Sequence, residues 1–154
     1  MKFIVLLRHG IAEDKRPDKN DADRELTPEG RKKMKDVARA LVDIFPEAEA
    51  IWSSPLVRAM QTAEMVAKAY GVEVQTTDSL EPRASVREFR KFLDSLKVDF
   101  AIFTGHEPNM SAIMLDLTGM QGDVSLKKGG FYGVRIEGGV SQLEWMVPPR
   151  VVRA

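Results

Sequence analysis

The chain contains 154 residues, enough for one domain that buries a core without disulfides or metal ions. Apolar residues make up 44% of the sequence and charged residues 30%, as in ordinary globular proteins. Lysine plus arginine equals aspartate plus glutamate at 23 each, and this balance argues against nucleic acid or an anionic membrane as a partner. The absence of cysteine excludes a disulfide framework, a thiolate metal site and a cysteine nucleophile.

The first apolar segment, Phe3 to Leu7, is too short for an export signal or a membrane span. A signal-peptide core needs roughly seven to fifteen apolar residues, and a membrane helix needs about twenty. We therefore expect a cytoplasmic protein. The sequence also contains no linker, repeat or low-complexity stretch, and we expect residues 1–154 to form a single domain and a monomer.

The N-terminal third predicts a strand, a loop and a helix. The apolar run from Phe3 to Leu7 fits a strand that is buried on both faces of a parallel sheet. Residues 11–26 are highly polar and fit an exposed loop. A helix is expected to begin with Thr27 as its N-cap and Pro28 at its first position, and to end before Pro46.

The middle of the sequence continues the alternation of strands and helices. A short strand is expected at 50–52, followed by a helix that opens at 54–55 and stops at Gly71. Another brief strand is expected at 72–75. The spacing of Ser85 to Glu88 is that of a capping box, and it predicts the start of a further helix.

The C-terminal third changes this rhythm. An apolar strand at 100–104 and a helix from Pro108 to Gly119 are followed by two expected strands, 131–137 and 140–147. Glycines at 138–139 join these two strands, which is typical of a hairpin. The whole pattern predicts an α/β protein whose parallel sheet is covered on both faces, with an antiparallel addition near the C-terminus.

Both histidines of the chain follow predicted strands. His9 comes after the first strand, His106 comes after the strand at 100–104, and each has glycine beside it. In an open α/β sheet, ligands bind in the crevice beyond the carboxyl ends of the strands. A single histidine is more often structural or at the surface, but two at such strand ends indicate one shared site.

Two arginines add positive charge near this edge. Arg8 directly precedes His9, and Arg58 lies one turn into the helix expected after residues 50–52. Most arginines are solvated surface charges, but a guanidinium pairs two phosphate oxygens and keeps its charge. A neutral imidazole is a competent nucleophile towards phosphorus, and cationic groups stabilise the charge on the equatorial oxygens. These residues therefore predict a phosphoryl-transfer site that works without a metal.

A metal site is the alternative use of two histidines. It needs carboxylate ligands close to both, and the nearest candidate is Glu107, whose side-chain direction the sequence does not fix. The sequence contains no P-loop, no Gly-x-Ser-x-Gly elbow and no Gly-x-Gly-x-x-Gly motif.

Three segments resemble the motifs of the histidine phosphatase superfamily, which includes the phosphoglycerate mutases. Leu7 to Gly10 reads Leu-Arg-His-Gly, like the family signature. Residues 53–63, Ser-Ser-Pro-Leu-Val-Arg-Ala-Met-Gln-Thr-Ala, resemble the second motif, and Gly105 to Asn109, Gly-His-Glu-Pro-Asn, resembles the third. Asp23 to Gly30 is similar to a segment of the short SixA-type phosphohistidine phosphatases, whose length the chain also matches.

The resemblance implies a three-layer α/β/α sandwich on a mostly parallel sheet, with no cofactor and no metal. It implies that His9 is phosphorylated and that Arg8, Arg58 and His106 bind the phosphate. Glu81 is a candidate general acid, but it lacks the glycine context found in mutase-like members and fits a solvated loop carboxylate equally well. A phosphoramidate suits such a site, because its imidazole leaving group can be protonated before it departs.

Three functions stay open on the sequence. The first is a phosphoprotein phosphatase that acts on phosphohistidine in a signalling or phosphotransfer protein, since a chain with no room for lid insertions suits an open pocket. The second is a phosphatase of a small phosphorylated metabolite. The third is a non-catalytic phosphate-binding module, which the presence of every core catalytic position disfavours. A mutase is disfavoured because the chain lacks the added segments and the acid motif.

Overall fold

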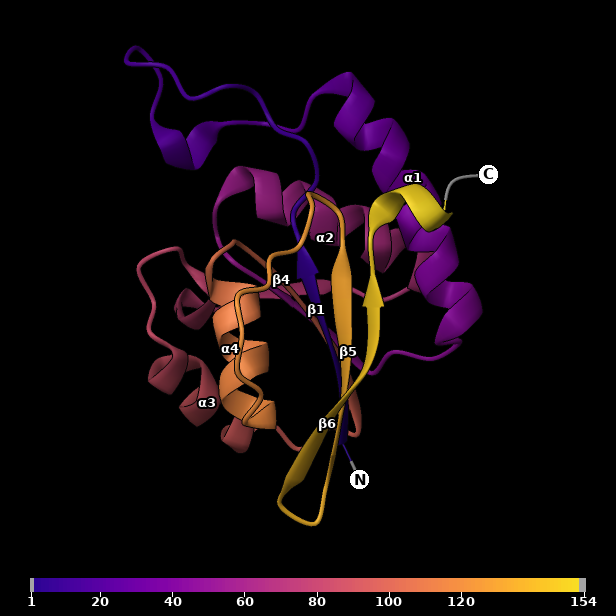
Figure 1. The fold of residues 1–154 in the computed structure, drawn as a ribbon. Coiled ribbons are helices and arrows are strands. Elements are labelled where there is room, and N and C mark those ends of the chain that lie inside the picture. The colour runs from indigo at the N-terminus through magenta and orange to yellow at the C-terminus, as the bar shows by residue number, and fades with distance from the viewer. Residues whose placement is uncertain (1, 153–154) are drawn as a thin grey trace.

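The computed structural model describes residues 2–152 and contains a six-stranded sheet between two layers of helices (Figure 1). The strand order is β3-β2-β4-β1-β5-β6. Four strands run parallel to one another: β1 (Lys2–Arg8), β2 (Ala50–Ser53), β3 (Val74–Thr76) and β4 (Phe100–Gly105). Two strands extend the sheet in antiparallel fashion: β5 (Phe131–Glu137) and β6 (Val140–Val147). The predicted α/β/α sandwich with its antiparallel addition is confirmed.

The central strand β1 is buried on both of its faces. Ile4 and Leu6 point into one apolar cluster, and Val5 and Leu7 point into the other. This division follows from the strand geometry, because successive side chains point to opposite faces of a sheet. All four side chains are fully buried, so the apolar run predicted this strand correctly.

Helices α1 (Pro28–Ile44) and α2 (Val57–Tyr70) cover the face of the sheet that Val5 and Leu7 share. The start of α1 is fixed as predicted, because the side chain of Thr27 accepts the backbone N–H of Gly30 at 2.9 Å. The end of α2 is also as predicted, since Gly71 adopts the left-handed conformation with φ of 73°.

Helices α3 (Val86–Ser95) and α4 (Asn109–Thr118) cover the opposite face (Figure 1). The predicted capping box is present at the start of α3, between Ser85 and Glu88. Phe89 and Leu93 are the buried residues of α3. Within residues 2–152, no helix is long and apolar enough to cross a bilayer.

Residues 11–26 differ from the exposed loop that was expected. Ala12 and Leu26 are buried and form an isolated antiparallel bridge, and Asp21–Asp23 form a short 3₁₀ helix. The end of this loop is held against its start, because the N–H of Thr27 donates to the carbonyl oxygen of Ile11 at 3.0 Å. Glycine is required at position 30, since a Cβ atom there would lie only 2.1 Å from the same oxygen. In Figure 1 the indigo loop lies above the carboxyl ends of the strands.

Candidate active site

His9 and His106 lie side by side at the carboxyl edge of the sheet. The parallel pairing of β1 with β4 places Arg8 opposite Gly105, so each histidine directly follows one of two neighbouring strands. The N–H of His9 donates to the carbonyl oxygen of Gly105 at 3.0 Å, and the two imidazole centroids are 5.3 Å apart. The exposed fractions of the two residues are only 7% and 3%. The structure therefore brings both histidines into one buried site.

A hydrogen bond to the next residue fixes the orientation of the His9 ring. Nδ1 of His9 lies 2.7 Å from the carbonyl oxygen of Gly10. Because a carbonyl oxygen can only accept, Nδ1 carries the proton, and in the neutral ring Nε2 keeps the lone pair. Gly10 is itself confined, since a Cβ atom there would lie 2.7 Å from Cγ of Met34 in α1. The turn after β1 thus sets which nitrogen of His9 can react.

The second histidine is held by a serine of the segment between β2 and α2. Nε2 of His106 lies 2.9 Å from Oγ of Ser54, and this oxygen also accepts the N–H of Leu56 at 3.2 Å. Ser54 was expected to open the second helix, which in fact begins at Val57. Its side chain instead orients His106, whose Nδ1 is buried with no hydrogen-bond partner among the described residues.

Burial keeps both imidazoles neutral at physiological pH. It lowers the pKa of His9 to about 4, against the opposing effect of the Gly10 hydrogen bond. The positive charge of Arg58 also lowers the pKa of His9. Burial lowers the pKa of His106 to about 3, and the neighbouring His9 and Arg58 act in the same direction. A negative charge that enters this pocket would raise the pKa of both histidines and so oppose the effect of the arginines.

The Arg8 side chain lies at the end of β1 and is anchored by the chain that leads into β5. Its Nη1 donates to the carbonyl oxygen of Leu126 at 2.6 Å, and its backbone N–H donates to Gly130 at 3.0 Å. Partial burial lowers the pKa of the Arg8 guanidinium. Its Nε is buried and has no hydrogen-bond partner among residues 2–152.

Arg58 lies in the first turn of α2, and Asp21 of loop 11–26 holds its side chain. Its Nη1 donates to the backbone carbonyl of Asp21 at 2.9 Å, and its Nη2 donates to Oδ2 of Asp21 at 3.2 Å. Partial burial alone would raise the pKa of Asp21, but the charges of Arg58 and Arg24 outweigh it and lower this pKa. Nε of Arg58 is buried and has no partner in the described part of the chain. No sequence motif predicts this ion pair.

Arg24 is a further basic residue near the pocket that was not singled out from the sequence. Its Nε donates to Oδ1 of Asp21 at 2.9 Å, and its Nη1 donates to the carbonyl oxygen of Glu13 at 2.7 Å. The charge of Arg24 also lowers the pKa values of His9 and His106, although burial has a larger effect on both. The loop therefore brings a third arginine within electrostatic reach of both histidines.

Glu107, the candidate metal ligand, binds protein groups instead. Its Oε1 accepts the N–H of Ser111 at 2.8 Å, and its Oε2 accepts the hydroxyl of Ser111 and the N–H of Leu126, the latter at 2.8 Å. Glu107 thereby fixes the segment whose Leu126 carbonyl anchors Arg8. Among residues 2–152, no group of three or more histidine, cysteine, aspartate or glutamate side chains could hold a metal ion.

Glu81 is half-buried in the turn after β3, and no hydrogen bond of its carboxylate to another described residue is present. The turn itself is held by Asn109 of the third motif, whose Nδ2 donates to the carbonyl oxygens of Glu81, Pro82 and Ala84 at 3.2–3.4 Å. Glu81 therefore belongs to a positioned turn, but it has no bond to either histidine.

A family model named "Histidine phosphatase superfamily (branch 1)" matches residues 4–85, which include Arg8, His9 and Arg58. This chain belongs to that superfamily. It is also 36% identical over 140 residues to an uncharacterized protein of Picosynechococcus sp., an alignment that covers 86% of this chain and 84% of the relative. Membership in the superfamily supports a phosphatase.

Solved structures share the whole fold with this chain at low sequence identity. The protein histidine phosphatase SixA complexed with tungstate has a TM-score of 0.89 and 22% identity, with 98% of this chain and 99% of that chain covered. A mycobacterial glucosyl-3-phosphoglycerate phosphatase in complex with inorganic phosphate has a TM-score of 0.79 and 14% identity, with 97% and 99% covered. These likenesses concern the fold.

Proposed function

We propose that residues 1–154 act as one phosphatase domain in which Nε2 of His9 accepts the phosphoryl group. The observation that carries this proposal is the 2.7 Å hydrogen bond between Nδ1 of His9 and the carbonyl oxygen of Gly10. It assigns the single proton of the neutral ring to Nδ1 and leaves Nε2 as the nucleophile. The pKa of His9, lowered to about 4 by burial, keeps this ring unprotonated at pH 7.

The substrate phosphate binds between Arg8, Arg58 and His106 in this proposal. Each of these side chains has one buried nitrogen that no described residue satisfies, and such nitrogens are available to phosphate oxygens. Ser54 completes the arrangement. In this proposal the Ser54 hydroxyl donates its proton to Nε2 of His106, and the ring proton of His106 is then on Nδ1, where it can be donated to the phosphate.

The reaction has two steps. In the first, Nε2 of His9 bonds to phosphorus while the bond from phosphorus to the leaving group breaks. In the second, water attacks phosphorus, the electron pair of the phosphorus–nitrogen bond returns to Nε2, and the water protons leave with inorganic phosphate. His9 holds its Nδ1 proton on Gly10 throughout, so it departs from phosphorus as a neutral imidazole.

Phosphohistidine on a protein is the proposed substrate. A phosphorylated imidazole is protonated on its second nitrogen before it leaves, so its departure needs no acid from the enzyme. Glu81 also lacks the glycine context of the acid in mutase-like members, and a site without an assured acid suits such a leaving group. The fold shared with SixA over nearly the full length of both chains supports the same choice.

A small phosphorylated metabolite is the second candidate. The mycobacterial enzyme of the same fold is named for a sugar phosphate, and its leaving oxygen is much more basic than an imidazole nitrogen. The turn before Glu81 does border the end of β4, since the Leu80 carbonyl oxygen would lie 3.6 Å from a Cβ atom on Gly105. In this candidate Glu81 is the general acid.

Comparing kcat/KM for a phosphohistidine protein with kcat/KM for a panel of sugar and nucleotide phosphates separates the two substrates. We expect the phosphohistidine protein to be preferred. Preference for one small ester, with saturation at low concentration, would refute the protein substrate. A non-catalytic module would hydrolyse no aryl phosphate at all, whereas we expect turnover that His9→Ala abolishes.

Replacing Glu81 with glutamine gives a sharper test of the leaving group. We expect Glu81→Gln to change the turnover of phosphohistidine by less than about twofold, because no acid is required. A loss of about 100-fold or more on phosphohistidine would show that Glu81 is a required acid. Glu88→Gln, on α3 at the capping box, is a control for effects on the fold.

A further inference from the structure

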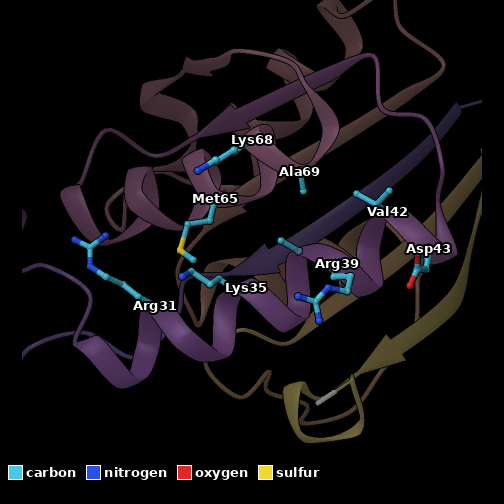
Figure 2. A pocket seen from close by; sticks show the side chains of 9 residues that line it. Arg31, Lys35, Arg39, Val42, Asp43, Met65, Lys68 and Ala69 are labelled. Atoms are coloured by element: carbon cyan, nitrogen blue, oxygen red, sulfur yellow. The ribbon is translucent and has the colours of Figure 1, made fainter. Parts of the chain in front are cut away.

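A groove with a volume of about 740 Å³ lies between α1 and α2, on the helical layer rather than in the pocket of the two histidines (Figure 2). Its apolar lining consists of Ala38, Val42, Met65 and Ala69. Met65 extends from α2 towards α1 in Figure 2. The groove has no part in the phosphoryl-transfer chemistry described above.

The rim of this groove is mostly positively charged. One carboxylate, Asp43, lies at its far end. Four exposed basic side chains line the rest: Arg31, Lys35, Arg39 and Lys68. Arg31 and Arg39 have only long ion pairs of 3.8 Å. Within residues 2–152, Lys35 and Lys68 have no carboxylate within salt-bridge distance. A chain with balanced overall charge thus concentrates unneutralised positive charge here.

We propose that this groove docks an acidic amphipathic helix of the phosphoprotein substrate. The inference rests on the proposed function, because it describes how the same enzyme recognises its protein substrate. Arg31 and Asp43 are separated by about 18 Å along α1, which accommodates roughly three turns of a partner helix. An apolar floor between basic walls is complementary to a helix with an apolar stripe flanked by carboxylates.

The groove is also coupled to the catalytic pocket through α2. This helix carries Arg58 in its first turn and Met65 and Lys68 further along. At the other wall, Arg31 near the start of α1 pairs with Glu25, a residue of the loop that also supplies Asp21 to Arg58. A helix bound in the groove therefore contacts α2, which carries Arg58, and α1, whose Arg31 lies 3.8 Å from the carboxylate of Glu25. In this proposal it orients a phosphohistidine carried elsewhere on the same partner.

Binding of the groove to an anionic lipid surface is a different proposal, and the shape argues against it. The apolar lining residues lie between two helices and include no exposed large side chain, whereas the large exposed apolar residues Trp145 and Met146 lie on β6, away from the basic rim. Vesicles are therefore included in the test as a competing result.

The test uses the double variant Lys35→Glu/Lys68→Glu and a matched control, Lys91→Glu/Lys97→Glu, which reverses two exposed lysines on and after α3. The binding probe is a synthetic helical peptide with leucine at every third or fourth position and glutamate elsewhere. We expect its NMR shifts to map to α1 and α2. We expect the groove variant to weaken its binding by at least about tenfold and the control variant to leave it unchanged.

Turnover measurements connect this surface with substrate choice. The substrates are an acidic phosphotransfer domain and a basic histone, both phosphorylated on histidine with phosphoramidate. We expect wild-type protein to prefer the acidic substrate, and Lys35→Glu/Lys68→Glu to lose about tenfold in kcat/KM on it while hydrolysing an aryl phosphate normally.

Three outcomes would overturn the docking proposal while leaving the phosphatase proposal intact. These are equal peptide binding by both double variants, binding of phosphatidylserine vesicles with no binding of the peptide, and equal turnover of the acidic substrate by both variants. Absence of aryl phosphate hydrolysis in the wild-type protein would instead refute the proposed function, and peptide binding would still be measured independently.

Discussion

The two sides of the phosphate pocket are built in different ways. On the side formed by the sheet edge, the N–H of His9 donates to the carbonyl oxygen of Gly105, His106 directly follows Gly105, and both histidines are buried. On the side formed by loop 11–26, Asp21 reaches Arg58 through an ion pair, and the Asp21 side chain is 38% exposed. The reacting groups are thus placed by the fold itself, whereas part of the electrostatic environment comes from a segment that solvent reaches.

This difference predicts unequal costs of substitution on the two sides. A buried group at the end of a central strand cannot be replaced by a neighbour or by water. A carboxylate that is partly solvated shares its role with water and with backbone carbonyls, and its ion pair is screened. The following experiments test that contrast.

The largest effect is expected for His9→Ala. Loss of the nucleophile should reduce kcat/KM on an aryl phosphate by about 10⁴-fold or more, because no other group occupies its position. His106→Ala should keep measurable turnover, since it removes a phosphate-binding group. Steady-state assays measure kcat/KM for both variants, and circular dichroism checks that both are folded. Equal losses of kcat/KM would show that the two histidines act as a single unit.

Arg58→Ala should have the next largest effect. We expect a decrease of about 10²–10³-fold in kcat/KM, because a charge aimed at the equatorial oxygens is lost. Arg39→Ala, an exposed arginine of α1, is the matched control and should behave like wild type on a small substrate. A decrease of less than about threefold for Arg58→Ala would remove this residue from the site.

Asp21→Asn tests the loop side directly and should cost only about three- to tenfold in kcat/KM. The backbone carbonyl of Asp21 still accepts from Arg58 in this variant, so the guanidinium loses part of its orientation. Asp23→Asn, an exposed neighbour, is the control. Faster turnover by Asp21→Asn would mean that the carboxylate competes with the substrate for Arg58.

Burial of the two histidines also affects stability at acid pH. The pKa values of His9 and His106 are lowered to about 4 and about 3 by burial, so between these values and about 6.5 the unfolded chain binds more protons than the folded one. The contribution of the two histidines to the free energy of unfolding should be constant above pH 6.5. Below pH 6.5 the free energy of unfolding should fall by about 1.4 kcal/mol per pH unit for each histidine.

Urea unfolding at pH 7 and pH 5 measures this dependence. His106→Gln should reduce the slope, because it removes one of the two buried imidazoles. Equal free energies of unfolding at the two pH values would show that the histidines are not buried as described.

The sheet edge was accessible from the sequence and the loop side was not. A continuous apolar run identifies a strand that is buried on both faces, and the residue after it is then known to lie at a carboxyl end; His9 and His106 were found in this way. The adjacency of β1 and β4 was not contained in that pattern, because it depends on strand order.

The contacts of Asp21 and Ser54 had no local signal. Asp21 and Arg58 are 37 residues apart, and the polar segment around Asp21 shows no periodicity that fixes which side chain turns inward. Ser54 followed by Pro55 has the composition of a helix start, yet α2 begins at Val57 and the Ser54 side chain is hydrogen-bonded to His106. Such contacts arise only when distant segments are folded together.

Direct detection of the phosphorylated residue is the most decisive measurement for the proposed mechanism. The protein is incubated with a phosphohistidine protein, quenched in alkali to preserve phosphoramidates, digested and analysed by mass spectrometry. The mechanism predicts a phosphoryl group on the peptide that contains His9, and its absence in His9→Ala. Phosphorylation of His106, or a phosphoenzyme that survives in His9→Ala, would contradict it.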